Sequence, residues 1–356
     1  MIAVGADSRY EVIVSRFWEI KLVQYRNLGS SGVKVSPLCL GTMMFGGATD
    51  ESESIRIMHR AADDGINFFD TANIYNAGES ERVVGKAISD RRDSIIVATK
   101  GRVAIGQGPN EQGSSRVHIM RECERSLQRL GTDYIDLYYL HAPDYETPIE
   151  ESLRALDDLV CQGKVRYIGC SNFRAWRLCE AQWISDRRNF NRFICVQPLY
   201  NIVNRDVEVE LLPLCREHGI GVVPYSPLAR GILTGKYGSK GVFPEGSRAA
   251  RGDQRMHQVE IRDESFMVAE ALKSRMESSG RKLSQFALAW CLENQTVDSV
   301  IIGPRTMEQF EDNLGALECS VNAEDEAFVN ELVPEGEHTG QGFPDPAYPV
   351  LGRYVD

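Results

Sequence analysis

The sequence predicts an α/β protein folded as a single (β/α)8 barrel, or TIM barrel, because two patterns alternate along it. Short apolar runs are typical of strands buried on both faces of a parallel sheet, and segments of helical periodicity separate them. Eight such runs occur, the number of strands that closes this barrel. We expect the strands at residues 38–41, 67–70, 95–100, 134–141, 165–171, 194–197, 221–225 and 299–303.

The chain before the first of these strands falls into two parts. Charged residues repeatedly interrupt the apolar residues of segment 1–24, so we expect no secretory signal and treat it as an N-terminal extension. Residues 25–35 read YRNLGSSGVKV, which is typical of a hairpin with a Ser-Gly turn. This hairpin is expected to plug the N-terminal mouth of the barrel.

Helices are expected between the strands, and three of them are marked by their ends. One begins near Asp50 and stops at Gly65, and a second runs from Ser115 to Gly131, each with apolar residues at helical spacing. The third is predicted to begin with a capping box, in which Thr147 caps the helix and Glu150 closes the box. This helix should stop at Gly163.

The domain organisation follows from the connections. Strand and helix patterns fill residues 25–333, which we expect to form one barrel domain with long loops at its C-terminal face. No strand is followed by the G-x-G-x-x-G turn of an open dinucleotide-binding sheet. Three longer connections, 101–114, 234–262 and 334–356, are rich in Gly, Pro or charge. The last is a tail that we expect to cover the barrel mouth.

Composition excludes several functions. The formal net charge of −11 disfavours nucleic acid and anionic membrane surfaces as partners. No apolar run approaches the ~20 residues that span a bilayer. The nine cysteines show neither C-x-x-C nor metal-ligand spacing, so we expect free thiols, no metal and a cytoplasmic location. They stand at positions 39, 123, 161, 170, 179, 195, 215, 291 and 319.

Four polar residues at strand ends suggest catalysis. In a barrel of this type, active sites form where the strands end at the C-terminal face. Asp70, Lys100 and His141 end three successive predicted strands, and Tyr75 follows Asp70 closely. Tyr75 is a candidate proton donor whose pKa a nearby Lys100 would lower, while Asp70 would keep the lysine charged. His141 would polarise a carbonyl oxygen by a hydrogen bond.

Each of these residues alone also has an ordinary structural role. Asp70 could cap a turn, Lys100 could be a solvated charge, Tyr75 could be a packing residue, and His141 could be a satisfied buried histidine. Their joint occurrence at the mouths of successive strands, in the order that the chemistry needs, favours the catalytic interpretation.

The segments that carry these residues resemble a known family. DTANIY (70–75), ATK (98–100) and YYLHAPD (138–144) are similar to motifs of the aldo-keto reductase superfamily. The resemblance covers roughly residues 25 to 333 and includes branches like aryl-alcohol dehydrogenases and channel β subunits. It implies an NAD(P)H-dependent oxidoreductase that reversibly reduces an aldehyde or ketone to an alcohol, with Tyr75 as the proton donor.

Further segments resemble the cofactor site of that family: GKVRYIGCSNF (163–173), VVPYSPLARGILTGKY (222–237) and GPRTMEQFEDN (303–313). Basic residues in the last two favour NADPH over NADH, because a 2′-phosphate needs a cationic partner. Arg248 and Arg251 are alternative partners. The resemblance implies cofactor contacts from Gly41, Thr42, Met43, Asp70, Ser171, Asn172, Gln197, Tyr225, Ser226, Leu228, Arg230, Gly231, Lys236, Gly303, Arg305, Gln309 and Asn313.

Two other functions stay open. The channel β subunits of the family act chiefly through partners, although their histidine position is typically asparagine, whereas this chain has His141. A (β/α)8 lyase or isomerase acting on phosphate esters would want a phosphate loop where SPLARG (226–231) stands, but it has no clear use for the four polar residues.

The expected partner is a small-molecule carbonyl compound of unknown identity, and the physiological direction stays open. Oligomerisation is also open, since the family includes monomers and assemblies. Expected pocket walls are Met43, Phe45, Arg102 and Tyr145, with Phe343 and Tyr348 folding over from the tail.

Overall fold

Eight parallel strands form one sheet in the order β10-β3-β4-β5-β6-β7-β8-β9. The computed structural model describes residues 23–238, 243–245, 247, 249–252, 254–340 and 345–348. The sheet closes on itself where Asp298 N donates to Val222 O (3.0 Å) and Ile301 N donates to Pro224 O (3.1 Å). The predicted (β/α)8 barrel is thereby confirmed. Its strands are β3 (Leu38–Gly41), β4 (Phe68–Asp70), β5 (Ile96–Gly101), β6 (Ile135–Leu140), β7 (Val165–Ser171), β8 (Phe193–Gln197), β9 (Gly221–Val222) and β10 (Val300–Ile302).

Each predicted strand has a counterpart, and β9 differs most from its expected length. The expected strand 221–225 shortens to Gly221–Val222. Pro224 lacks the N–H that a central strand must donate, so regular pairing stops before it. Tyr225 is held instead by a single bridge to Leu199.

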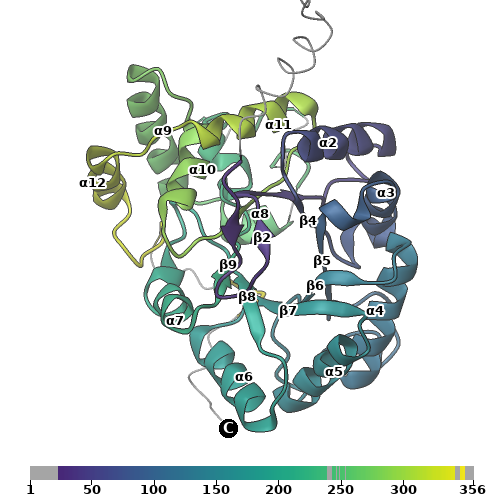
Figure 1. Cartoon of the computed structure of the whole chain (residues 1–356). Coiled ribbons are helices and arrows are strands. Elements are labelled where there is room, and N and C mark those ends of the chain that lie inside the picture. Colours follow the sequence, from purple (N-terminus) through teal and green to yellow (C-terminus); the bar gives the residue numbers. More distant parts are fainter. Residues whose placement is uncertain are drawn as a thin grey trace, which may run out of the picture.

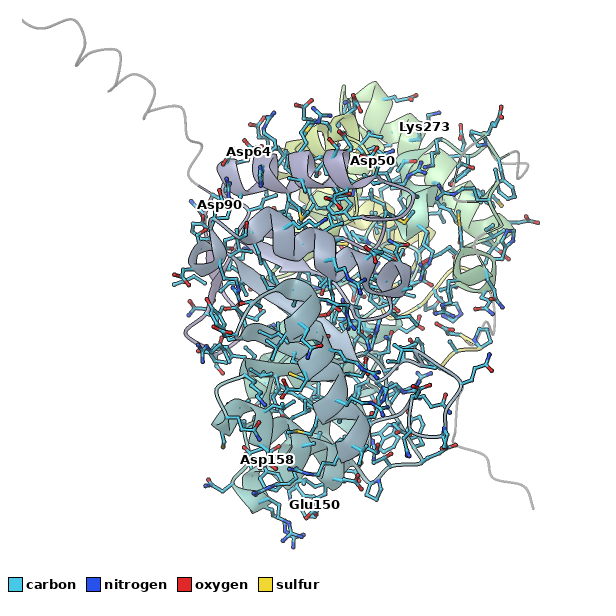
Figure 2. All side chains as sticks on the ribbon, turned by 90° about the vertical axis from the view of Figure 1, so that its right-hand side faces the viewer. Asp50, Asp64, Asp90, Glu150, Asp158 and Lys273 are labelled. Carbon is cyan, nitrogen blue, oxygen red and sulfur yellow. The ribbon has the colours of Figure 1, made fainter. Side chains whose placement is uncertain are left out.

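Helices surround the strands as a ring (Figure 1). In Figure 2, Asp50 and Asp64 mark the two ends of α2, and the end at Asp50 lies on the side of the C-terminal mouth. The helices are α2 (Glu51–Asp63), α3 (Glu79–Ile88), α4 (Arg116–Leu130), α5 (Ile149–Cys161), α6 (Ala175–Arg188), α7 (Leu211–His218), α8 (Gln254–Val259), α9 (Asp263–Ser278), α10 (Leu283–Glu293), α11 (Met307–Leu314) and α12 (Ala323–Leu332), with short 3-10 turns η1 (Tyr75–Gly78), η2 (Arg92–Ser94), η3 (Asp206–Glu208), η4 (Ala229–Thr234) and η5 (Gly315–Leu317).

The start of α5 corrects one prediction. The capping box expected from Thr147 and Glu150 does not form, and the N-cap residue is Pro148, without a side-chain hydrogen bond. The Thr147 hydroxyl donates to Asp144 Oδ2 at 2.8 Å instead. The neighbouring carboxylate therefore competes successfully for the side chain that would have capped the helix.

The hairpin predicted at 25–35 is present as β1 (Arg26–Asn27) and β2 (Lys34–Val35), which pair antiparallel. Leu28, at its turn, is fully buried in the cluster inside the barrel. Ser30 N donates to Gly219 O at 2.8 Å, just before β9 begins. The hairpin therefore plugs the N-terminal mouth.

Apolar side chains fill two layers that follow the alternation of the strands. In β3, Cys39 points into the barrel, whereas Leu38 and Leu40 pack in the larger cluster between strands and helices. A closed barrel of eight strands has room inside for only a few layers of side chains, so most of the core lies between the strands and the helices. The inner cluster consists of Leu28, Val35, Cys39, Phe68, Ala98, Leu137, Tyr139, Cys195, Val223 and Ile301.

Three further observations bear on the expected partners. Every helix within the described residues is too short or too polar to cross a membrane. The nine cysteines, all in described positions, are free thiols. Within the same residues, no group of His, Cys, Asp and Glu side chains is arranged to hold a metal ion.

Candidate active site

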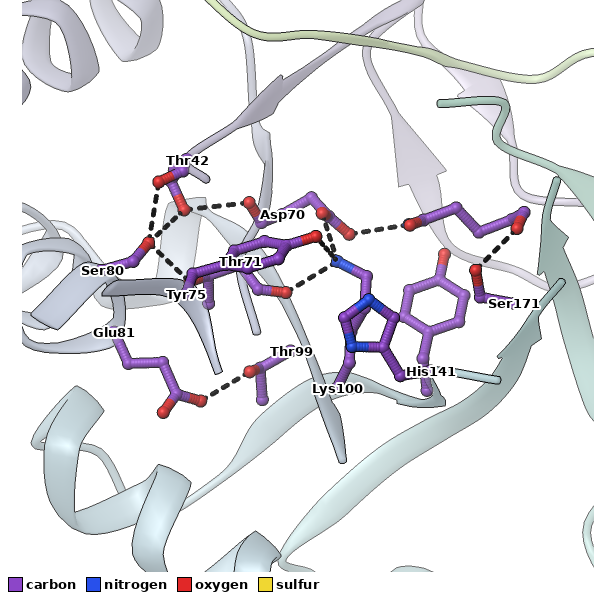
Figure 3. Close-up of polar contacts among 12 residues, drawn as sticks. Thr42, Asp70, Thr71, Tyr75, Ser80, Glu81, Thr99, Lys100, His141 and Ser171 are labelled. Carbon is purple, nitrogen blue, oxygen red and sulfur yellow. Dashed lines mark hydrogen bonds and ion pairs between the residues drawn. The ribbon is translucent and has the colours of Figure 1, made fainter. Parts of the chain in front are cut away.

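The four candidate catalytic residues meet at the C-terminal mouth of the barrel (Figure 3). Asp70 is the last residue of β4, and Lys100 lies near the end of β5. His141 follows β6, and Tyr75 begins η1. Because the strands are parallel, their carboxyl ends share one mouth, so residues up to 71 positions apart in sequence form one cluster.

A buried ion pair forms the base of this cluster. Lys100 Nζ donates to Asp70 Oδ1 and to the carbonyl of Thr71, the latter at 2.7 Å. Lys100 is completely buried and Asp70 nearly so. Burial by itself lowers the pKa of Lys100, but Asp70 and Tyr75 outweigh it, so the pKa is raised and the amine stays charged. The expected role of Asp70 therefore matches its contact.

Tyr75 lies against this pair. Lys100 Nζ approaches the Tyr75 hydroxyl at 3.5 Å. Burial raises the pKa of Tyr75 and the opposing charge of Lys100 offsets only part of that rise, so the net shift is upward. The lowering expected from Lys100 alone is thus corrected: desolvation of the phenolate is the larger effect in this structure. Tyr75 consequently carries its proton at neutral pH.

His141 faces Tyr75 edge-on, with ring centroids 5.9 Å apart. Burial, together with the charges of Lys100 and Arg102, lowers the pKa of His141 to about 3. Its Nδ1 is buried and has no hydrogen-bond partner within the described residues. At neutral pH this side chain is therefore an uncharged imidazole with unused hydrogen-bonding capacity.

Beside the four residues, the ends of β7 and β8 supply a group of amides. Asn172 takes a left-handed conformation (φ 62°), and its Nδ2 donates to His141 O at 3.0 Å. Tyr225 donates to Asn172 Oδ1 at 2.7 Å. Gln197 Nε2 donates to Asp70 Oδ2 at 2.8 Å, and Ser171 donates to Gln197 O at 2.8 Å. The residues expected to contact the nicotinamide end thus lie together next to the catalytic group.

The loop after β9 has unusual backbone geometry. Ser226, Ala229, Arg230 and Gly231 all have positive φ, from 45° to 104°. A short run of such conformations turns backbone N–H groups toward a common point, which is how many proteins bind phosphate. The loop expected to hold the pyrophosphate therefore has a suitable backbone. Arg230 contacts buried Glu260 at 3.8 Å.

Two arginines approach one another at the expected adenosine end. Burial, and then the charge of Arg251, lowers the pKa of Arg305. Arg305 N donates to Gln309 Oε1 at 2.9 Å. Clustered like charges are unfavourable unless an anion lies between them. Together with the loop after β9, these residues offer positive charge and backbone N–H groups to the phosphates of a dinucleotide. Of the other residues expected here, Gly303 is exposed, Asn313 is buried and Lys236 lies near the ring of Tyr237, whereas Arg248 lies outside the described residues.

The remaining predicted contacts differ in how much surface they offer. Thr42 is buried and donates to Asp70 O at 3.0 Å, so it supports the site from behind. Phe45 is fully buried in the outer core, which leaves it no surface for a substrate in this structure. Tyr145 is 47 % exposed and stacks on Trp176. Gly41 is buried, Met43 and Leu228 are partly exposed.

The tail reaches the same mouth. Burial raises the pKa of Tyr348, and smaller electrostatic effects come from Arg102 and Tyr75, so this residue lies near the catalytic group. Arg255 binds Asp345 through two hydrogen bonds of 2.6 and 2.7 Å. Sequence reasoning missed this pair, although both partners stand in long connections that it had singled out. Phe343 lies outside the described residues.

Comparisons with known proteins agree with this geometry. The model of the Aldo/keto reductase family matches residues 37–333. The chain is 40 % identical over 323 residues to the "Uncharacterized oxidoreductase YrpG" of Bacillus subtilis (strain 168), covering 88 % of this chain and 96 % of that protein. It is also 40 % and 39 % identical over 302 residues to proteins named "Probable voltage-gated potassium channel subunit beta" from Arabidopsis thaliana and Oryza sativa subsp. japonica; each alignment covers 83 % of this chain and 92 % of the relative. The chain therefore belongs to the aldo/keto reductase family of oxidoreductases.

Proposed function

We propose that this protein reduces an aldehyde or ketone to an alcohol with NADPH, and that Tyr75 donates the proton. One observation carries the proposal: a protonated Tyr75 lies between the buried Lys100–Asp70 pair and an uncharged His141 with an unpartnered nitrogen. A barrel held together by packing alone would not bury these ionisable groups side by side at its mouth.

The residues divide the work of carbonyl reduction. A bound reduced nicotinamide supplies the hydride. His141 donates a hydrogen bond to the carbonyl oxygen and stabilises the negative charge that develops there. Tyr75 transfers its proton to the same oxygen, which yields the alcohol. Lys100, held charged by Asp70, stabilises the phenolate that remains until solvent restores its proton.

The preference for NADPH rests on the cationic end of the site. Arg305 and Arg251 are close enough for one charge to lower the pKa of the other guanidinium. A 2′-phosphate placed between them would relieve this repulsion and accept charge-assisted hydrogen bonds. NADH offers only a hydroxyl at that position. Arg305→Ala should therefore weaken the binding of NADPH much more than that of NADH.

A second candidate function follows from two of the relatives. The Arabidopsis and rice proteins are named as probable channel β subunits. By that analogy, the barrel would bind its cofactor and act mainly through a protein partner. His141 favours turnover instead, because an uncharged imidazole facing Tyr75 has a defined task in carbonyl reduction and none in partner binding.

The test combines cofactor binding with turnover. Protein fluorescence titrated with NADPH and NADH gives the two affinities, and loss of reduced-nicotinamide absorbance with a panel of aldehydes and ketones gives activity. Tyr75→Phe should lower kcat by roughly 10²–10⁴-fold and leave NADPH affinity nearly unchanged, because only the proton donor is lost. Tyr167→Phe, at a tyrosine 37 % exposed on β7, is the matched control and should be neutral.

Three outcomes would overturn parts of this proposal. Native turnover by Tyr75→Phe would remove the tyrosine from its assigned role. NADPH binding without turnover of any carbonyl compound would support the partner-binding function. Failure to bind either cofactor would overturn both candidate functions.

A further inference from the structure

Arg102 is a cation at the barrel mouth that has no carboxylate partner among the residues that the structure describes. It stands two residues after Lys100, just beyond β5. Within the described residues it forms no ion pair, and its buried Nε has no hydrogen-bond partner. Taking a guanidinium nitrogen out of water without a partner is costly. Such a group at the edge of an active site therefore indicates a ligand that completes it.

Three other cations at this mouth have carboxylate partners. Lys100 is paired with Asp70, Arg255 with Asp345, and Arg230 with Glu260. Asp144, the acidic residue nearest to His141 in sequence, is already occupied by Ser114 N and by the Thr147 hydroxyl. Within the described residues, Arg102 thus contributes a positive charge beside the catalytic group that no carboxylate compensates. A chain with a net charge of −11 otherwise repels small anions.

The backbone holds Arg102 in place at a cost. Its φ is 110°, a conformation that residues with a Cβ rarely adopt, and its carbonyl accepts a hydrogen bond from Gly113 N at 2.9 Å. A glycine would occupy this position without strain. Strain of this kind persists where the surrounding structure enforces it, and it is concentrated at ligand-binding sites. The chain therefore keeps a long cationic side chain where backbone geometry alone favours glycine.

His141 N donates to the carbonyl of Gly101 at 2.9 Å, which places the next residue, Arg102, beside the reacting groups. Its charge lowers the pKa of His141 and acts in the same direction on Tyr348 of the tail. His141 is the proposed donor to the substrate carbonyl, so Arg102 lies next to the position of the substrate rather than on the outer surface. Tyr348 adds a hydroxyl on the side of the tail.

We propose that Arg102 binds an anionic group of the substrate, so that the preferred substrates are aldehydes or ketones that carry a carboxylate or a phosphate. The inference rests on the proposed function, because it needs a carbonyl bound between Tyr75 and His141. A guanidinium donates two parallel hydrogen bonds to either kind of anion. Arg102 is therefore a determinant of substrate specificity and takes no part in proton transfer.

The test compares charged substrates with uncharged counterparts. 4-Carboxybenzaldehyde is paired with benzaldehyde, and glyceraldehyde 3-phosphate with glyceraldehyde. The native protein should show a lower KM for the charged member of at least one pair, and the pair that shows it distinguishes carboxylate from phosphate. Arg102→Gln should raise that KM roughly 10–100-fold, as expected for the loss of charge-assisted hydrogen bonds, with kcat changed little. The KM of the uncharged member should stay within about two-fold.

Two matched variants separate local recognition from other effects. Arg102→Lys keeps the charge but loses the paired hydrogen bonds, so it should recover only part of the affinity. Arg116→Gln removes the same charge from an exposed residue at the start of α4, where Arg116 pairs with Asp158. It should leave the KM of the charged and the uncharged substrates unchanged. Raising the salt concentration should raise the KM of the charged substrate for the native protein more than for Arg102→Gln.

The outcomes distinguish this inference from the proposed function. Turnover that depends on Tyr75 but shows no preference for the charged member of either pair would overturn the anionic subsite and leave the reductase function standing. Equal losses for charged and uncharged substrates in Arg102→Gln would also overturn it. If no carbonyl compound is turned over, benzoate and inorganic phosphate titrated against the NADPH-loaded protein still test the subsite. At least one of them should bind more weakly to Arg102→Gln than to the native protein. Equal binding of both would overturn the assignment.

Discussion

The two mouths of the barrel use the same kinds of residue for opposite purposes. At the N-terminal mouth the hairpin closes the barrel, and Asp298 Oδ2 accepts hydrogen bonds from Gly29 N (2.9 Å) and Val222 N (3.2 Å). At the C-terminal mouth Asp70 instead holds a buried cation and an amide. One carboxylate joins backbone segments, whereas the other maintains a charge beside an open site.

Backbone strain follows the same division. At the N-terminal mouth, Gly29, Gly131, Gly163 and Gly219 take left-handed conformations that glycine adopts without strain, although Asn189 at the end of α6 also has a positive φ. At the C-terminal mouth, several residues with side chains take positive φ besides the glycines: Asn76, Ala77, Arg102, Asn172, Ser226, Ala229 and Arg230. Among the described residues, non-glycine residues with positive φ are therefore concentrated at the mouth that forms the candidate site, where strain of this kind is often found.

The largest effect on stability is expected at the C-terminal mouth. Asp70→Asn leaves Lys100 buried without a counter-charge, which should lower the free energy of unfolding by about 3–5 kcal/mol. The double variant Asp70→Asn/Lys100→Met removes the charge as well and should regain most of that loss, but no activity. Urea unfolding of the two single variants and the double variant measures the coupling. Additive losses would show that the pair is not a unit.

The plug provides the second test. Gly29 has a φ of 56°, and a Cβ there would lie 2.4 Å from Gly221 N and 2.6 Å from Gly219 O. Gly29→Ala should therefore lower the free energy of unfolding by about 2–3 kcal/mol through overpacking and strain. kcat should stay within about two-fold, because the hairpin is at the far mouth. A large loss of kcat in the folded variant would mean that the two mouths are coupled.

The difference between the mouths also explains what the sequence could predict. Asp70, Lys100 and His141 were predicted because alternating patterns locate strand ends, and the barrel topology converts strand ends into neighbours. The hairpin was predicted from its turn residues. These inferences need only the order of elements along the chain, which a single sequence contains.

Properties that depend on how deeply a side chain is buried, or on which of several partners it contacts, were not predictable from the sequence. The pKa of Tyr75 rises because burial outweighs Lys100, and burial depth is not visible in the sequence. Thr147 bonds Asp144 instead of capping its helix, and Phe45 is buried rather than exposed to the site. The pair of Arg255 and Asp345 joins residues 90 positions apart. Each outcome depends on which of several possible neighbours is nearest in space.

Asp298, the carboxylate that contacts the hairpin, should make the free energy of unfolding depend on pH. Burial raises the pKa of Asp298 from its ordinary value of 3.8 to about 6. The favourable contribution of the protonated form is complete below about pH 4 and is lost as the pH rises through about 6, amounting to about 3 kcal/mol. Asp298→Asn keeps an acceptor oxygen but cannot ionise, so this loss should be absent from it.

Urea unfolding at several pH values between 4 and 7.5 measures that difference. The same variant should keep its kcat at neutral pH, since Asp298 lies at the mouth opposite the site. Identical pH profiles for the native protein and Asp298→Asn would contradict the assignment of the raised pKa to burial.

The smallest expected effect tests the contrast in strain directly. Replacing Arg102 by glycine relieves its φ of 110°, whereas replacing it by alanine removes the same charge and keeps the Cβ. Arg102→Gly should be more stable than Arg102→Ala by about 1 kcal/mol, because relief of strain exceeds the greater entropy of glycine in the unfolded chain. Both variants should lose the preference for charged substrates equally, since both lack the guanidinium.

Gly131, which caps α4 at the other mouth with φ 62°, provides the control. Gly131→Ala should lower the free energy of unfolding without altering substrate preference. If Arg102→Gly gains nothing over Arg102→Ala, the conformation at 102 is not strained, and the mouths differ in chemistry alone.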